Sequence, residues 1–123
     1  MAFLVAVTSS VQAKWIEVGT SAEKGETYFF DPETTQNNGD LRKAWVLSNY
    51  DEKQVGGYHS ANTFYEFDCN DSKVRSVTML LYSDLNATGN VVGAHHKEAV
   101  EPWTHFSPSS IFNKLSKTLC VEN

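Results

Sequence analysis

Residues 59–70 read HSANTFYEFDCN, and polar and apolar side chains alternate along most of this run. Such alternation is typical of a β-strand with one buried face, because successive side chains point to opposite sides of the sheet. One face receives Ala61, Thr63, Tyr65, Phe67 and Cys69. The other receives Ser60, Asn62, Glu66 and Asp68, with Phe64 as an aromatic exception. The run therefore predicts a strand that carries a thiol on its inner face.

The chain contains two cysteines, Cys69 and Cys120. In a chain of this size that reaches an oxidising compartment, two cysteines most simply form one structural disulfide. Cys120 closes a segment with helical spacing, so the pair predicts a covalent link between the strand and a C-terminal helix. A disulfide between Cys69 and Cys120 would close the loop between them and raise the free energy of unfolding by about 4 kcal/mol on the chain-entropy model. A catalytic or metal-binding thiol would need a second cysteine nearby, and the sequence has none.

The composition fits one ordinary domain. The chain has 123 residues, of which 41% are hydrophobic and 12% aromatic, enough to build a core. The formal net charge of -5 argues against nucleic acid as a partner, since nucleic-acid binders present basic surfaces. Charges of both signs are interspersed, which disfavours disorder driven by charge.

The first thirteen residues, MAFLVAVTSSVQA, carry no charge and resemble the apolar region and cleavage site of a secretory signal peptide. The run is too short to span a bilayer, and the basic segment that usually precedes such a region is missing. We expect residues 1–13 to be a truncated leader and residues 14–123 to be a single exported domain. The alternative is an apolar N-terminus of a cytosolic protein.

Five other segments predict strands. They are residues 14–18, 26–31, 41–50, 73–83 and 91–98. Residues 73–83 are apolar on both faces, which predicts the most covered strand, near the centre of the sheet. Trp45 and Leu47 are the core candidates of residues 41–50, and residues 91–98 read as an edge strand.

The end of the chain predicts a helix. Ser107 is a candidate N-cap and Pro108 suits the first helical position. An apolar face then follows at helical spacing, with Lys114 and Lys117 on the solvent side; the face contains Ile111, Phe112, Leu115 and Leu119. The fold class is thus α+β, an antiparallel sheet of about six strands with one C-terminal helix packed on one face and tethered by the disulfide.

Side chains that could perform chemistry do not form a recognisable active site. His95 and His96 are adjacent in a predicted strand and point to opposite faces, so they are poorly placed to bind one metal ion. Glu66 and Asp68 share a face, but charged residues on an outer strand face are typical of a solvated surface. The sequence contains no nucleophile elbow, phosphate-binding glycine loop or His-Glu-x-x-His motif. We therefore predict no enzyme, no metal and no cofactor.

The outer face of residues 59–70 is the candidate partner surface. Most aromatic residues are needed for the core of a small sheet, but Phe64 lies on the polar face of its strand. Tyr58, beside two glycines, is a second exposed aromatic candidate. Together with Glu66 and Asp68, these residues form the predicted site for a protein partner.

An ordered set of short motifs resembles the surface-adhesin protein E-like family of Gram-negative bacteria. The motifs span residues 14–120 and comprise Trp15-Ile16-Glu17-Val18, Tyr28-Phe29-Phe30-Asp31, Arg42, residues 45–50, Asp68-Cys69, Arg75, Tyr82, Trp103, Ser107-Pro108 and Cys120. The resemblance implies a sheet of antiparallel strands with a C-terminal helix held by a disulfide. It also implies a surface protein that binds host matrix and serum proteins such as laminin and vitronectin.

The sequence departs from that family at the cleavage site. Ala13-Lys14 stands where a lipid-accepting cysteine would be expected, so we expect no lipid anchor at that position. Two functions stay open for an exported chain at the cell surface, secreted or in the periplasm. One is adhesin-like protein binding through an exposed strand face. The other is a periplasmic domain that binds a small ligand or assists an envelope complex, for which a pocket between sheet and helix is expected.

Overall fold

The structure is a computed structural model that describes residues 14–21, 23–96 and 102–121, so the predicted leader lies outside the described residues. The elements are β1 (Ile16–Ser21), β2 (Glu26–Phe30), the 3-10 turn η1 (Pro32–Thr34), β3 (Gln36–Asn38), β4 (Leu41–Tyr50), β5 (Ser60–Asp68), β6 (Lys73–Asp84), β7 (Thr88–His96), β8 (Thr104–His105) and α1 (Ile111–Leu119). The predicted strands are confirmed; the last residues of the segment 91–98 also fall outside the described part.

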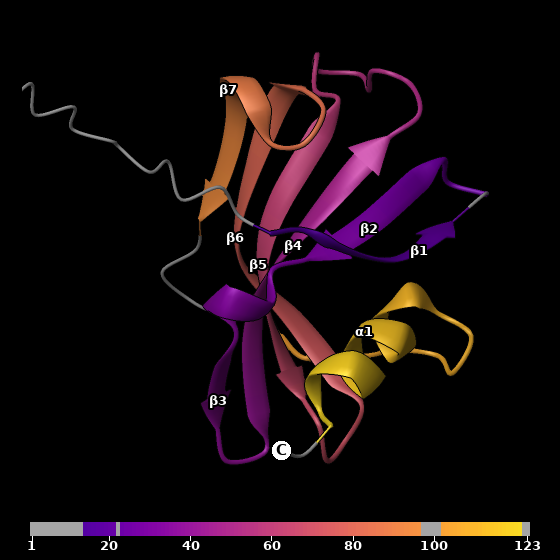
Figure 1. The fold of residues 1–123 in the computed structure, drawn as a ribbon, viewed down its shortest axis with the longest axis vertical. Coiled ribbons are helices and arrows are strands. Elements are labelled where there is room, and N and C mark those ends of the chain that lie inside the picture. The colour runs from indigo at the N-terminus through magenta and orange to yellow at the C-terminus, as the bar shows by residue number, and fades with distance from the viewer. Residues whose placement is uncertain (1–13, 22, 97–101, 122–123) are drawn as a thin grey trace, which may run out of the picture.

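The strands form one antiparallel sheet in the order β1-β2-β4-β5-β6-β7. Two short strands extend it, since β3 pairs with β4 and β8 pairs with β6. The sheet is curled, and α1 packs against its concave side (Figure 1). The predicted α+β fold class is therefore confirmed, with the two short strands β3 and β8 as additions that the sequence pattern did not indicate.

The inner face of β5 packs against the helix. Phe67 and Leu115 are completely buried, and the Phe112 ring lies 6.5 Å from that of Phe67 and 5.3 Å from that of Tyr65. The strand register adds Ala44 of β4 to this core, because Ala44 lies opposite Tyr65 and residues directly opposite share a face. The contact predicted between the inner strand face and the apolar helix face is thus confirmed.

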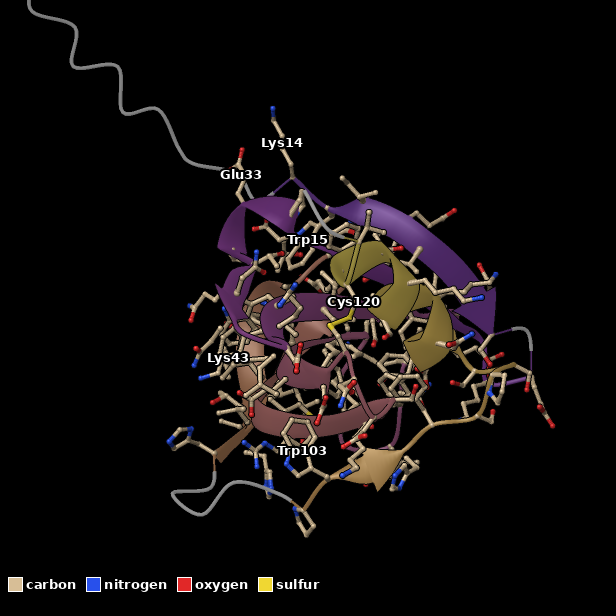
Figure 2. The ribbon with its side chains drawn as sticks, turned by 90° about the horizontal axis from the view of Figure 1, so that it is seen from below. Lys14, Trp15, Glu33, Lys43, Trp103 and Cys120 are labelled. Carbon is tan, nitrogen blue, oxygen red and sulfur yellow. A yellow bond between two sulfur atoms is a disulfide. The ribbon has the colours of Figure 1, made fainter. Side chains whose placement is uncertain are left out.

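The disulfide joins the sheet to the helix as predicted. Cys69 follows the last residue of β5 and Cys120 is the C-cap of α1. The S–S distance is 1.97 Å and the Cα atoms are 5.7 Å apart. Figure 2 shows the bond beside Cys120, on the inner side of the curled sheet. The end of β5 therefore cannot separate from the end of α1.

The helix begins three residues later than Ser107 would place it. Ser110 is the N-cap, and its side-chain oxygen accepts a hydrogen bond from the Asn113 N–H at 3.3 Å. The Ser110 N–H donates to the Ser107 carbonyl at 3.1 Å, so residues 107–110 form a turn ahead of the helix. The prediction of a Ser107 N-cap is wrong, because α1 starts at Ile111 and the serine directly before it, Ser110, accepts the capping hydrogen bond.

Two packing predictions are also corrected. In β6 only Val74 is buried, since it is the one β6 residue in the core cluster under the helix, and β6 lies next to the terminal strand β7. The central, most buried strands are β4 and β5. In β4, the helix-side core residues are Ala44 and Val46. Leu47 is buried on the opposite face, and Trp45 on that face is only half-buried.

Candidate binding surface on the outer face of the sheet

Three charged residues lie in one row across the outer face of the sheet. Register places Lys43 of β4 opposite Glu66 of β5, and Glu66 opposite Arg75 of β6. The Arg75 Nε–H donates to Glu66 Oε1 at 2.7 Å, and Nη2 contacts the same oxygen. The Lys43 Nζ lies 3.8 Å from Glu66 Oε2. The carboxylate is therefore held between two cations on neighbouring strands.

Glu66 is not solvated, so that part of the prediction for the outer face is wrong. Its exposed fraction is only 4%. A buried carboxylate needs compensating charges and hydrogen bonds, and Arg75 and Lys43 provide them. Glu66 contacts these two side chains rather than solvent, so it fixes the positions of Lys43 and Arg75 on the outer face.

Trp103 covers the guanidinium group of Arg75. The Arg75 Cζ lies 4.0 Å from the centroid of the Trp103 ring, which is cation–π geometry. Arg75 is thus fixed by the Glu66 carboxylate in the plane of its guanidinium and by an indole on its face. Figure 2 shows Trp103 and Lys43 on the outside of the curl, away from α1.

The next row of the outer face is aromatic. Trp45 of β4 lies opposite Phe64 of β5, with their ring centroids 5.0 Å apart. Both side chains are half-buried and keep part of their rings in solvent. We call these two rows together with Trp103 the outer patch. It consists of Lys43, Trp45, Phe64, Glu66, Arg75 and Trp103.

Asp68 and Tyr58, the other two predicted partner residues, do not join the outer patch directly. The Asp68 carboxylate caps the turn that follows β5, accepting hydrogen bonds from the Asn70 and Asp71 N–H groups at 2.9 and 3.2 Å. Tyr58 lies in the connection between β4 and β5, where its ring makes an edge-to-face contact with Tyr50 at 5.5 Å. The structure therefore brings Phe64 and Glu66 together, places Asp68 at the end of the same strand, and leaves Tyr58 apart.

The concave face carries a group of tyrosines near Glu26. Burial raises the pKa of Tyr28, and a hydrogen bond with the Glu26 side chain raises it further. Burial also raises the pKa of Tyr50 and of Tyr65. These phenols stay protonated over the physiological range, so they act as packed rings and hydrogen-bonding groups, not as bases.

The histidines do not form a metal site in the part of the chain that the structure describes. His95 and His96 lie opposite Met79 and Thr78 respectively, so they point to opposite faces as expected. The His96 Nδ1 is 2.8 Å from the Thr78 hydroxyl. Among the described residues, no group of three potential ligands gathers, and no helix is long and apolar enough to cross a membrane.

A cavity of about 620 Å³ opens between the sheet and the start of the helix. Its aromatic lining comes from Tyr65 of β5 and Phe112 of α1, and its polar lining includes Arg75, Ser76 and His105. A concave space of this size is in the range used for small ligands. Arg75 also belongs to the outer patch, so the cavity and the outer patch meet at this residue.

The family profile of surface-adhesin protein E matches residues 15–121. The chain belongs to the surface-adhesin protein E family. The resemblance drawn from the sequence motifs is therefore confirmed. A comparison with curated proteins finds no match.

Solved structures of the family share the fold. A structure of Haemophilus influenzae protein E is 12% identical, with a TM-score of 0.66 over 89% of this chain and 86% of that chain. A second crystal form of that protein gives 12% identity and a TM-score of 0.67 over 97% and 96% of the two chains. Protein E from non-typeable Haemophilus influenzae is 11% identical, with a TM-score of 0.63 over 91% of this chain and 78% of that chain. At such low sequence identity, the similarity to these solved structures shows only that the folds are alike.

Three residues of the outer patch had no assigned role in the sequence interpretation. Lys43 and Arg75 are ordinary cations in alternating runs, and only the strand register shows that both reach Glu66. Trp103 lies in a segment without periodicity, so no pattern placed it over Arg75. The available signal was the presence of Arg75 and Trp103 among the motifs shared with the surface-adhesin protein E family.

Proposed function

We propose that this chain is an exported, non-enzymatic binding domain whose partner is a host extracellular-matrix or serum protein, contacted through the outer patch. Membership of a surface-adhesin family supports the class of function. The observation that carries the proposal is the combination of Trp45, Phe64 and the Arg75–Trp103 pair on the sheet face opposite the helix. Tryptophan and arginine are enriched among residues that dominate protein interfaces.

The geometry also favours a preorganised surface. Arg75 is held by Glu66 and Trp103, so little side-chain entropy remains to be lost when a partner binds. The Lys43 side chain is 40% exposed, and its contact with Glu66 is long at 3.8 Å, which leaves its charge available to a partner. The predicted contributions of Asp68 and Tyr58 to partner binding stay predictions.

Binding to immobilised laminin and vitronectin tests this proposal. We expect saturable binding by the wild-type chain and roughly tenfold weaker binding by Phe64→Ser, since a central aromatic contact is commonly worth 1–2 kcal/mol or more. Val55→Ser is the control, because Val55 is a fully exposed apolar residue in the connection between β4 and β5 and belongs neither to the outer patch nor to the predicted partner residues. Circular dichroism must show both variants folded. Absence of binding by the wild-type chain, or equal loss in both variants, would contradict the proposal.

Export is the second part of the proposal. The Cys69–Cys120 disulfide supports it, because such bonds form and persist in oxidising compartments. We propose that residues 1–13 are a secretory leader and that the mature chain starts at Lys14. Fractionation of the native host with mass spectrometry of the N-terminus tests this. A chain that starts at Met1 in the cytoplasm would contradict export.

The cavity between sheet and helix favours a second candidate, a periplasmic domain that binds a small ligand. Its volume of about 620 Å³ and its aromatic walls, Tyr65 and Phe112, support this alternative. Native mass spectrometry of protein purified from the host envelope tests it. A bound molecule that a Ser76→Trp variant no longer retains would favour the ligand-binding domain. A ligand-free protein that also fails to bind an apolar dye would exclude it.

A further inference from the structure

Residues 102–106, which we call the strap, contribute to two sites at once. Trp103 extends to the outer face of the sheet, where its ring covers the Arg75 guanidinium at 4.0 Å (Figure 2). The other four residues of the strap line the cavity between the sheet and the start of the helix, whereas Trp103 is not among the described residues that line it. One short segment therefore forms a wall of the cavity and the cover of the outer patch.

The strap is joined to the sheet by few contacts. Strand β8 consists of Thr104 and His105 alone; both are exposed, and they pair with the first two residues of β6. The Phe106 N–H donates to the Ser72 carbonyl at 3.3 Å, and the Phe106 side chain packs against the core. A segment with few hydrogen bonds and little buried apolar surface opens at a lower free energy than a core strand. Release of the strap is therefore the least costly local opening next to these two sites.

Both sites are complete only when the strap is docked against β6. Trp103 covers one face of the Arg75 guanidinium in this position, and release of the strap would remove that cover. The cavity would lose the wall that contains Phe106, and Ser76 on the opposite wall would open to solvent. Arg75 belongs to both sites, since it lines the cavity and pairs with Glu66 in the outer patch. The same docked state is thus required on both sides of the strap.

We infer that the cavity and the outer patch are coupled through the strap, so that a small apolar molecule in the cavity strengthens partner binding. A ligand that fits the cavity binds the docked state better than the released state, so it shifts the strap toward docking. The docked state holds Trp103 over Arg75, as the outer patch requires. The rings of Tyr65 and Phe112 in the walls set the apolar class of the ligand. This inference rests on the proposed function of the outer patch and on the cavity as a ligand site.

The first test uses the apolar dye N-phenyl-1-naphthylamine as the probe for the cavity, with its fluorescence as the readout. The wild-type chain should bind the dye, and Ser76→Trp, which fills the cavity, should abolish binding. Coupling between sites is reciprocal, so Trp103→Ala should weaken dye binding roughly fivefold although Trp103 does not line the cavity. Trp103→Phe keeps a ring over Arg75 and should restore most of the affinity.

Trp45→Ala is the matched control for Trp103→Ala. Trp45 is the other tryptophan of the outer patch, but it lies on β4, away from the strap, so its removal should leave dye binding at the wild-type level. Circular dichroism must show both variants folded. Equal dye affinity of Trp103→Ala and Trp45→Ala would overturn the inference, and so would absence of dye binding by the wild-type chain.

Amide hydrogen exchange follows the strap directly. Saturating dye should slow exchange in residues 103–106 roughly fivefold, because the dye favours the docked state. Exchange in residues 51–59, the connection between β4 and β5, should not change, since this connection joins the opposite ends of those strands. Unchanged exchange in the strap with dye bound would overturn the inference.

The last arm measures partner binding. Saturating dye should strengthen binding of the wild-type chain to immobilised laminin or vitronectin roughly fivefold and should have no such effect on Trp103→Ala. Weaker or unchanged binding in the presence of dye would overturn the inference. If the dye and exchange results hold but neither host protein binds with or without dye, the coupling of cavity and strap stands, and the proposed partner of the outer patch is wrong.

Discussion

Glu66 shows how a single buried carboxylate organises the outer patch. Its oxygens accept contacts from Arg75 and Lys43, two cations that reach it from different strands. The Arg75 side chain is 24% exposed, so it is fixed from beneath by Glu66 while part of it remains available to a partner. Removing the carboxylate charge would leave Arg75 under Trp103 without its counter-ion.

We predict that Glu66→Gln lowers the free energy of unfolding by about 1–3 kcal/mol, because the half-buried guanidinium loses a charged hydrogen-bond acceptor. Chemical denaturation measures the change. Asp71→Asn is the control, since the Asp71 side chain is 53% exposed in its 3.5 Å pair with Lys73. Such a surface pair contributes below about 0.5 kcal/mol. Equal effects of the two substitutions would show that Glu66 has no special structural role.

Tyr28 predicts how stability depends on pH in the alkaline range. Burial raises its pKa above the ordinary value of 10.0, so the folded chain keeps the phenol proton after the unfolded chain has lost it. The stability due to this group is therefore complete below pH 10 and falls as pH rises further, by about 1.4 kcal/mol per pH unit. Denaturation at several pH values above 10 should show a shallower decline for Tyr28→Phe. The same slope in both proteins would contradict the prediction.

At the scale of elements, two serines compete as the start of the helix. The Ser110 hydroxyl oxygen accepts a hydrogen bond from the Asn113 N–H. Within the part of the chain that the structure describes, the Ser107 hydroxyl is hydrogen-bonded to the Ser109 hydroxyl and not to a backbone N–H of α1. We predict that Ser110→Ala lowers stability by about 1 kcal/mol through loss of the N-cap. Ser107→Ala should change stability by less than half as much. Thermal unfolding measures both, and the reverse order would restore Ser107 as the cap.

The strands show how far local pattern predicts a fold. Tyr65 and Phe67 were placed on the core side by alternation alone, since the strand period fixes which residues share a face. The burial of Glu66 could not be predicted in this way, because it depends on Lys43 and Arg75, which only the register of three strands brings together. Trp103 came from a segment without periodicity, so its place over Arg75 required the tertiary structure.

At the scale of the whole molecule, a curled sheet and a single short helix enclose one core. Leu115 and Leu119 are the fully buried helix residues, and they meet Phe67 and Val46 from the concave side of the sheet. A helix of nine residues is marginal on its own, so its formation depends on this contact. The disulfide is therefore the link that keeps both layers of a small core together.

We predict that Cys69→Ala/Cys120→Ala lowers the free energy of unfolding by about 4 kcal/mol, the chain-entropy value for cysteines 51 residues apart. Such a loss is a large share of the 5–15 kcal/mol typical of a domain, so α1 should also become more accessible to proteolysis. Denaturation of the wild-type chain with and without reductant is the control, and the reductant should reproduce the loss while leaving the variant unchanged. If the oxidised and reduced wild-type chains were equally stable, packing of Leu115 and Phe112 alone would hold the helix on the sheet.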